Sequence, residues 1–278
     1  MSEAAPLRPA ATLVLLDGPE DAPRTLLLKR AAQSPFMANA WVFPGGRVDD
    51  ADHAPAAAPG FPPELAQIML QRSMGFGEEA EARAHLVCAL RETFEEAGVL
   101  LGATDATDAV VDAARRRLLA GETTWDAVLV ELGASLAWDE LIYGDHWVTP
   151  PVERRRYDTR FYLARVGGRG AAAMHDAHET TESAWLSAEE ALARHATGEL
   201  GLAPPTFWLL TRFAELGTID GILTWAAARD VIPMAPAVLP RKGGGVAIVL
   251  PGDHEHPTSP GEGEHRVVWG GRGWSLVR

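Results

Sequence analysis

RETFEEAGV, residues 91–99, places four charged side chains and a glycine inside an otherwise apolar run, HLVCALRETFEEAGVLL (85–101). An α-helix over residues 78–101 would put Glu92, Glu95 and Glu96 together on one side. Its apolar side chains would fall on the other side, within an arc of roughly 80°: Val87, Leu90, Phe94, Ala97 and Leu101. The stretch therefore predicts an amphipathic helix that carries three carboxylates on one face.

The three carboxylates allow two interpretations. On a solvated face, each like-charged pair would cost roughly 0.2–0.5 kcal/mol. A hard divalent cation such as Mg²⁺ or Mn²⁺ prefers oxygen ligands, and its binding would turn this repulsion into attraction. Arg91 lies one turn before Glu95, within reach of an ion pair. The helix alone leaves both interpretations open.

A second motif upstream decides between them. The segment WVFPGG (41–46) reads as an aromatic strand that ends in a forced turn. Together with RETFEEAGV it resembles the box of the Nudix hydrolase family, G-x5-E-x7-R-E-U-x-E-E-x-G-U, in which U is a bulky aliphatic residue. The residues that match are the opening glycines and the second half of the box: Gly45, Gly46, Arg91, Glu92, Glu95, Glu96, Gly98 and Val99.

The sequence departs from that box in two places. Thr93 stands where an aliphatic residue is usual, and Gly46 and Arg91 are 45 positions apart, 31 more than the box allows. We place this insertion at about residues 47–83. Counted back from Arg91, the first glutamate of the box falls on Arg83, so that carboxylate is absent unless Glu79 or Glu81 replaces it.

The insertion and three longer segments are similar to one branch of the family, the acyl-CoA diphosphatases. These segments are LLLKRAAQSPFMANAWVFPGGRVDDAD (26–52), WVTPPVERRRYDTRFYLA (147–164) and LAPPTFWLLTRF (202–213). The resemblance implies a metal-dependent hydrolase that cleaves CoA or acyl-CoA to 3′,5′-ADP and a phosphopantetheine derivative. The alternatives are hydrolysis of ADP-ribose, dinucleotides or nucleotide sugars, and a non-catalytic Nudix-like binding module.

The resemblance also assigns roles to residues. Glu92, Glu95 and Glu96, with Gly45, would bind Mg²⁺ or Mn²⁺, and Arg91 would orient a neighbouring carboxylate. Glu92 would double as general base, for which Glu179 and Glu182 are alternatives. Substrate binding is assigned to Gly46, whose backbone can approach closely, and to three of the basic residues that could hold phosphates: Arg30, Arg47 and Arg160.

The fold that the resemblance implies is an α/β/α sandwich with a mixed sheet. Residues 1–200 would form the Nudix domain, and residues 201–278 an extension of helices and strands packed on it. The pattern predicts strands over 11–17, 24–30, 36–46, 147–150, 156–166 and 182–186, with further strands near the C-terminus. It predicts helices over 64–72, 78–101, 105–121, 123–133, 187–198, 204–217 and 218–230.

Composition limits the partners and the compartment. A formal charge of −13 argues against nucleic acid and anionic membranes as partners, which leaves a small diphosphate compound. Cys88 is the single cysteine, so the chain forms no internal disulfide and no zinc ribbon, and it fits a reducing cytoplasm. The N-terminal apolar run is too short for a signal peptide, and no run of about 18 apolar residues predicts a membrane span. Assembly as a homodimer stays open.

Overall fold

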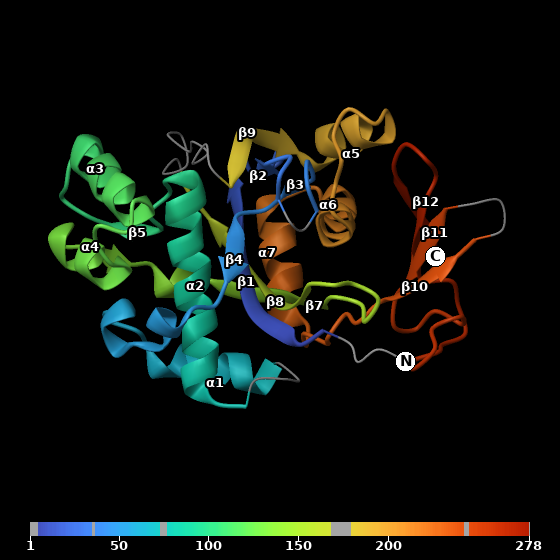
Figure 1. The fold of residues 1–278 in the computed structure, drawn as a ribbon, viewed down its shortest axis with the longest axis horizontal. Helices are drawn as coiled ribbons and strands as arrows, with labels where there is room; N and C mark the ends of the chain where they lie inside the picture. Colours follow the sequence, from blue (N-terminus) through green and yellow to red (C-terminus); the bar gives the residue numbers. More distant parts are fainter. Residues whose placement is uncertain (1–4, 35–36, 73–76, 168–178, 242–244, 278) are drawn as a thin grey trace.

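The structure is a computed structural model, and it describes residues 5–34, 37–72, 77–167, 179–241 and 245–277. Its centre is a seven-stranded mixed sheet in the order β3-β2-β1-β8-β7, with β4 paired to β1 and β9 to β2 (Figure 1). β1 and β8 run parallel, and the other pairs are antiparallel. The strands are β1 (Leu7–Asp17), β2 (Arg24–Arg30), β3 (Trp41–Val42), β4 (Gly45–Arg47), β7 (Ile142–Val148), β8 (Arg156–Arg165) and β9 (Thr180–Ser187).

Two helical layers cover this sheet because its strands are apolar on both faces. Along β1, Leu13 and Leu15 face one layer and Val14 and Leu16 face the other. The first layer holds α1 (Pro63–Arg72), α2 (Glu79–Ala97), α3 (Asp108–Leu119) and α4 (Trp125–Glu131). The second holds α5 (Ala188–Ala196), α6 (Pro204–Leu216) and α7 (Ile219–Ala228). The α/β/α sandwich expected from the sequence is therefore confirmed (Figure 1).

Short elements complete the first layer, and two of them, η1 and η2, lie in the insertion. Three are single turns of 3₁₀-helix: η1 (Asp50–His53), η2 (Pro55–Ala57) and η3 (Trp138–Glu140). β5 (Gly102–Ala103) and β6 (Ser135–Leu136) form a two-stranded ladder. The indole nitrogens of Trp125 and Trp138 donate to the carbonyls of Ala57 and Pro59, at 3.2 and 3.0 Å. The insertion thus packs on the layer that contains α2.

The helix α2 is buried more completely than a simple amphipathic pattern predicts. Its acidic side also contains the buried residues His85, Cys88 and Glu96, because β4 and η1 lie against it. The helix ends at Ala97, so the prediction that it continues to residue 101 was wrong. Gly98 ends it in the left-handed conformation, at φ 71°, which glycine adopts without a steric penalty.

The C-terminal segment forms a separate antiparallel sheet beside the second layer (Figure 1). Its strands are β10 (Ala237–Pro240), β11 (Val246–Val249), β12 (Arg266–Trp269) and β13 (Trp274–Val277). Trp274 ties it to α5 and to the segment before α6, since its backbone N–H donates to His195 Nε2 at 2.7 Å and its indole N–H to the Leu202 carbonyl at 3.1 Å. The division of the chain after residue 200 stays a prediction. None of the helices within the described ranges is long and apolar enough to cross a membrane.

Candidate active site

The glycines of WVFPGG bring strand β4 against helix α2. Gly45 donates its backbone N–H to Glu96 Oε2 at 2.9 Å. Gly46 passes so close to Glu92 that a β-carbon would overlap that carboxylate. A β-carbon on Gly45 would overlap the backbone of β1 at Ala11 and Thr12. Glycine is required at both positions because the strand must approach the helix and β1 at backbone distance.

The three carboxylates gather where β4 meets α2. Glu96 is buried, the Glu92 side chain is 14% exposed and that of Glu95 is 23% exposed. Burial raises the pKa of Glu92 to about 7, an effect that Arg91 reduces and Glu95 reinforces. Burial and then the charge of Glu92 raise the pKa of Glu96 well above its usual range, and burial also raises the pKa of Glu95. The folded chain therefore disfavours the charged forms of these three carboxylates, and a bound cation would favour them.

Arg91 connects this cluster to the inserted segment. Its guanidinium makes two hydrogen bonds with Asp52, at 2.8 and 2.9 Å, and contacts Glu92 at 2.9 Å and Glu95 at 3.2 Å. Burial alone would lower the pKa of Arg91, but the bonds to Asp52 and the charge of Glu92 outweigh it and raise that pKa. Arg91 is thus a buried cation that contacts two of the three carboxylates.

Asp52 is the site residue that sequence reasoning missed. The carboxylate on Arg91 comes from neither Glu79, which is exposed, nor Glu81, which accepts from the Gly77 N–H. The signal was present, because Asp52 follows Gly46 at the spacing of G-x5-E, with aspartate in place of glutamate. Counting back from Arg91 instead ends at Arg83, inside the insertion, and so misses Asp52. We therefore propose that the insertion begins after Asp52.

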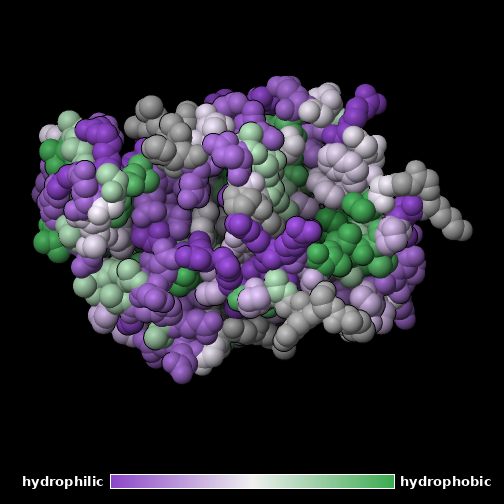
Figure 2. Space-filling model, viewed as in Figure 1, coloured by the Kyte–Doolittle hydropathy of each residue, from purple (hydrophilic) through white to green (hydrophobic). Residues whose placement is uncertain are grey.

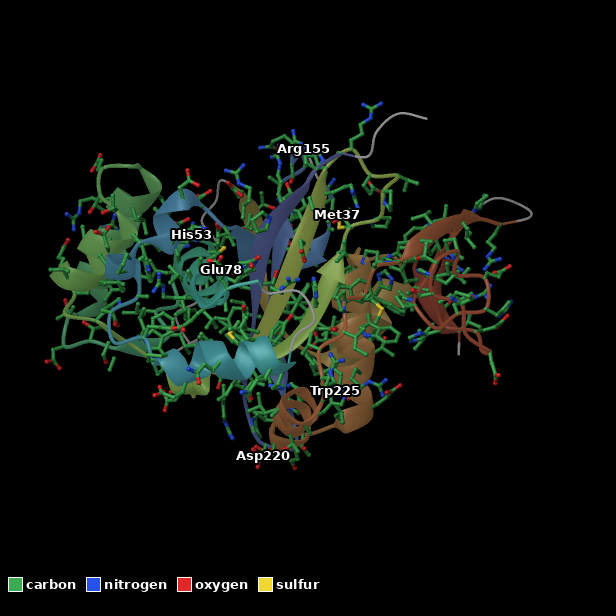
Figure 3. The ribbon with its side chains drawn as sticks, turned by 90° about the horizontal axis from the view of Figure 1, so that it is seen from below. Met37, His53, Glu78, Arg155, Asp220 and Trp225 are labelled. Atoms are coloured by element: carbon green, nitrogen blue, oxygen red, sulfur yellow. The ribbon has the colours of Figure 1, made fainter. Side chains whose placement is uncertain are left out.

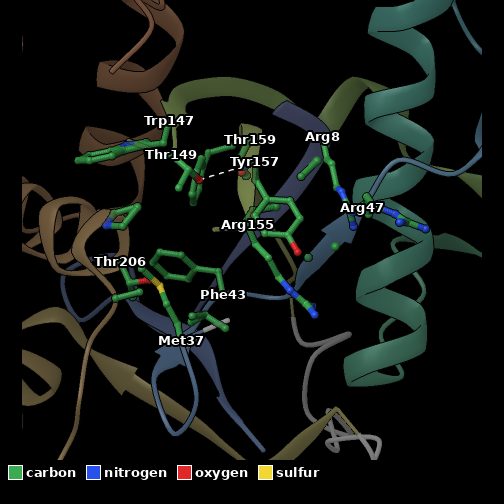
Figure 4. A pocket seen from close by; sticks show the side chains of 18 of the residues that line it. Arg8, Met37, Phe43, Arg47, Trp147, Thr149, Arg155, Tyr157, Thr159 and Thr206 are labelled. Atoms are coloured by element: carbon green, nitrogen blue, oxygen red, sulfur yellow. Dashed lines mark hydrogen bonds between the residues drawn. The ribbon is translucent and has the colours of Figure 1, made fainter. Parts of the chain in front are cut away.

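The carboxylates border a pocket of about 550 Å³ (Figure 4). Glu92 and Glu95 line it together with Arg30 and Arg47. Arg30 is held by Ser34 at 3.0 and 3.1 Å. Apolar residues line the far side, and three of them come from the C-terminal segment after α7: Met37, Phe43, Trp147, Pro204, Pro205, Pro236, Val238 and Ile248. Figure 2 shows hydrophilic residues over the middle of this face, beside a hydrophobic region near the C-terminal sheet.

Not every predicted site residue reaches this pocket. Thr159 and Phe161 line it, whereas Arg160 lies between them on β8 and points to the other face of the sheet. There Arg160 is 1% exposed and contacts His146 and Asp158. The structure therefore does not bring Arg160 together with the other substrate-binding residues.

The two alternatives for the general base, Glu179 and Glu182, lie in different surroundings. Glu179 lines the pocket and lies close enough to raise the pKa of both Glu92 and Glu96. Glu182 forms an exposed ion pair with Lys29 at 2.6 Å. Of the three candidates for the general base, Glu92 and Glu179 therefore line the pocket and Glu182 does not.

A polar cluster near the C-terminus lies outside the pocket. The run HDAH (175–178) falls outside the described residues. Near HEH (254–256), ligand atoms of Asp253, His254 and Glu255 lie within 4.8 Å of one another. Arg266 forms ion pairs with Asp253 at 2.6 Å and with Glu255. Burial alone would raise the pKa of Asp253, but the bonds from Arg266 and backbone N–H groups lower it to about 2. An arginine therefore already supplies the positive charge in this cluster.

Comparison with known proteins places this site in a family. The model of the NUDT19 Nudix domain matches residues 7–213, which include β4, α2 and most of the pocket. The chain belongs to the Nudix family. Its fold resembles the crystal structure of a Nudix hydrolase from Alicyclobacillus acidocaldarius, with a TM-score of 0.63 and 29% identity, covering 79% of this chain and 96% of that one. The chain is thus a Nudix hydrolase.

Curated relatives of this Nudix hydrolase carry a more specific name. Two are named acyl-coenzyme A diphosphatase NUDT19: the protein of Gallus gallus is 29% identical and that of Xenopus laevis 26% identical. Each alignment covers 87% of this chain, with 75% of the Gallus and 74% of the Xenopus protein. The human protein of the same name is 28% identical over 84% of this chain and 72% of its own length. The similarity therefore extends well beyond the box.

Proposed function

We propose that this Nudix hydrolase cleaves the diphosphate bond of CoA or acyl-CoA, giving 3′,5′-ADP and a phosphopantetheine or acyl-phosphopantetheine. One observation carries the proposal: a single pocket has the carboxylate cluster on one side and an apolar wall of Phe43, Trp147 and Val238 on the other. A diphosphate joined to a long, weakly polar arm matches that division. The names of the relatives support the same substrate class.

The residues present fit a hard divalent metal ion, for which we propose Mg²⁺ or Mn²⁺. Glu92, Glu95 and Glu96 offer oxygen donors, and a cation would favour their charged forms, which burial and, after it, neighbouring carboxylates disfavour. Gly45 and Gly46 bring the backbone of β4 directly against these carboxylates. When bound, the metal supplies charge neutralisation of the diphosphate and activation of water.

The side chains have distinct roles in this proposal. Arg91 keeps Glu92 and Glu95 in position, and Asp52 keeps Arg91 in position. Glu92 accepts the proton of the attacking water, since its carboxylate is the one in contact with both Arg91 and the Gly46 backbone. Arg30 and Arg47 bind phosphate oxygens at the pocket wall. The single buried cysteine, Cys88, supports a reducing compartment, and the cytoplasm is part of this proposal.

A substrate panel tests the function directly. Hydrolysis of CoA, acetyl-CoA, a long-chain acyl-CoA, ADP-ribose, NADH and a diadenosine polyphosphate is measured with Mg²⁺ or Mn²⁺. We expect CoA compounds to be preferred and a Glu95→Gln/Glu96→Gln variant to lose all activity. Glu189→Gln/Glu190→Gln, an exposed pair of adjacent glutamates on α5, is the matched control and should keep it.

Three outcomes would contradict parts of the proposal. Activity that survives in the Glu95/Glu96 variant would overturn the site assignment. A preference for ADP-ribose would retire the CoA substrate while leaving the Nudix chemistry in place. A wild-type protein that hydrolyses none of the compounds would favour a binding module.

A further inference from the structure

Two of the arginines that line the pocket, Arg8 and Arg155, have side chains that are unpaired within the part of the chain that the structure describes. Arg91 is paired with Asp52, Arg47 bonds Asp49 at 3.1 Å and Arg30 bonds Ser34. Arg8 and Arg155 also line the pocket, and neither side chain makes a hydrogen bond or ion pair with any residue that the structure describes. In a chain with a net charge of −13, two unpaired arginines at one pocket wall indicate an anionic ligand.

These two arginines are held close to each other by the backbone. Arg8 on β1 lies beside Tyr157 on β8 in the parallel ladder. Arg155 precedes that strand in a turn closed by two hydrogen bonds between Thr149 and Tyr157, at 2.9 and 3.0 Å. Arg156 anchors the same turn, because it donates to the carbonyls of Thr149 at 3.1 Å and Ala5 at 3.0 Å. The turn that carries Arg155 is thus fixed to the start of β1.

The figures show on which side of the pocket this pair lies. In Figure 4, Arg8, Arg47, Arg155 and Tyr157 lie toward α2, with Tyr157 between Arg8 and Arg155. Trp147, Thr206, Met37 and Phe43 occupy the opposite wall in that view. Figure 3 places Arg155 at one face of the molecule and Asp220 at the opposite face. The wall that carries Arg8, Arg47 and Arg155 is therefore next to the carboxylates. It is separate from the apolar wall that carries Trp147, Met37 and Phe43.

The distance from the carboxylates suits one nucleoside. Gly46 stands opposite Ala11 in the β1–β4 ladder, and Arg8 is three residues farther along β1. Three residues of a strand span about 10 Å. The backbone of Arg8 thus lies about 10 Å along β1 from the metal site, a separation that one nucleotide and the arginine side chains can span together.

We propose that Arg8 and Arg155 form a subsite for a phosphate monoester on the ribose 3′ position. This inference rests on the proposed function, since CoA carries such a group on the ribose that also bears its diphosphate. A phosphate monoester has a charge of about −1.5 to −2 near pH 7 and three acceptor oxygens, which two guanidinium groups can satisfy with paired bonds. Glu153 also lines the pocket, and its negative charge would repel a phosphate. Both arginines are therefore needed to make the electrostatic potential there favourable for a phosphate. The subsite would make the 3′-phosphate a determinant of specificity.

The test compares CoA with 3′-dephospho-CoA, two substrates that differ in this phosphate alone. We expect the wild-type kcat/KM to favour CoA by about 10–100-fold, the size of one or two charge-assisted bonds. Arg155→Gln and Arg8→Gln should each remove most of that preference by lowering kcat/KM for CoA. The loss on 3′-dephospho-CoA should be at most threefold. Arg154→Gln is the matched control, because Arg154 is an exposed arginine of the same turn that does not line the pocket.

A binding measurement separates this inference from the proposed function. Calorimetric titration with 3′,5′-ADP and with 5′-AMP needs no turnover, and we expect tighter binding of 3′,5′-ADP by the wild type and not by Arg155→Gln. Equal kcat/KM for both CoA compounds in the wild type would overturn the subsite and leave the diphosphatase function intact. An equal loss on both substrates in Arg155→Gln would also overturn it. Failure to hydrolyse either CoA compound would instead refute the proposed function.

Discussion

Asp52→Asn tests the contact that holds the two halves of the split box together. Asp52 is 1% exposed and makes a two-pronged ion pair with Arg91, which is 7% exposed. It also accepts from the Asp49 N–H at 2.9 Å, so it fixes the single turn η1 as well. Asparagine keeps the shape and one acceptor oxygen but removes the charge. Arg91 then becomes a buried cation whose remaining charged partners are Glu92, Glu95 and, at 3.8 Å, Asp49.

The magnitude follows from that geometry. Removing one partner of a buried ion pair costs about 3–5 kcal/mol, and the contacts that Arg91 keeps with Glu92 and Glu95 favour the lower end. About 3 kcal/mol corresponds to a fall in Tm of about 6–12 °C for a chain near this size. Arg91 would also turn toward the carboxylates, which should weaken metal binding by about 10–100-fold.

Thermal unfolding and a metal titration of activity measure the two effects. Asp50→Asn is the matched control, since Asp50 is an exposed neighbour on the same turn. Asp52→Glu should recover most of the loss, because glutamate occupies this position in the family pattern. An Asp52→Asn protein that unfolds within 2 °C of the control and needs no extra metal would refute the assignment of Asp52 as the first carboxylate of the box.

Three further predictions follow from single contacts. Gly46→Ala should fold normally but lose at least about 100-fold in kcat/KM, because its β-carbon displaces the flexible end of Glu92; circular dichroism and initial rates test this. In EDTA, Glu96→Gln should unfold at a higher temperature than the wild type, because it removes a buried carboxylate whose pKa is raised, whereas saturating Mg²⁺ should reverse that order; an unchanged order would count against a metal site. The folded-state pKa of Asp253, about 2, lies below its ordinary value, so its stabilising effect is complete above about pH 4 and is lost as the pH falls toward 2. Urea unfolding at pH 4.5 and pH 2.5 should therefore show a smaller decrease for Asp253→Asn than for the wild type.

Much of the fold could be predicted because its elements have strong local signals. The strand β2, predicted over 24–30, has those bounds, and Ser187 caps α5 by accepting from the Glu190 N–H, as the capping pattern indicates. β10 was missed in a proline-rich stretch, because Pro240 suppresses the strand signal although it occurs at the edge of a sheet. The aromatic segment 36–46 proved to be two short strands separated by Phe43 and Pro44.

The candidate site was predictable where the box is continuous and less so elsewhere. Glu92, Glu95 and Glu96 share one helix, so helical spacing alone brings them together. Arg160 was misplaced because its direction depends on the parity of β8 relative to β1, which long-range pairing decides. Arg8 gave no signal, since its place beside Arg155 depends on the parallel pairing of β1 with β8, whose starts are about 150 residues apart in the chain.

The pairing of Asp52 with Arg91 also explains why the site needs a cation. Arg91 is the basic residue bonded to the carboxylates of α2, and Asp52 already takes up much of its charge through two hydrogen bonds. Burial and neighbouring carboxylates raise the pKa values of Glu92, Glu95 and Glu96, so their charged forms are disfavoured until a cation binds. A chain selected for stability alone would place apolar residues there. The insertion has kept Asp52 in reach of Arg91 across 38 intervening residues, which is understandable if an unbalanced, well-positioned anionic cradle is what the reaction requires.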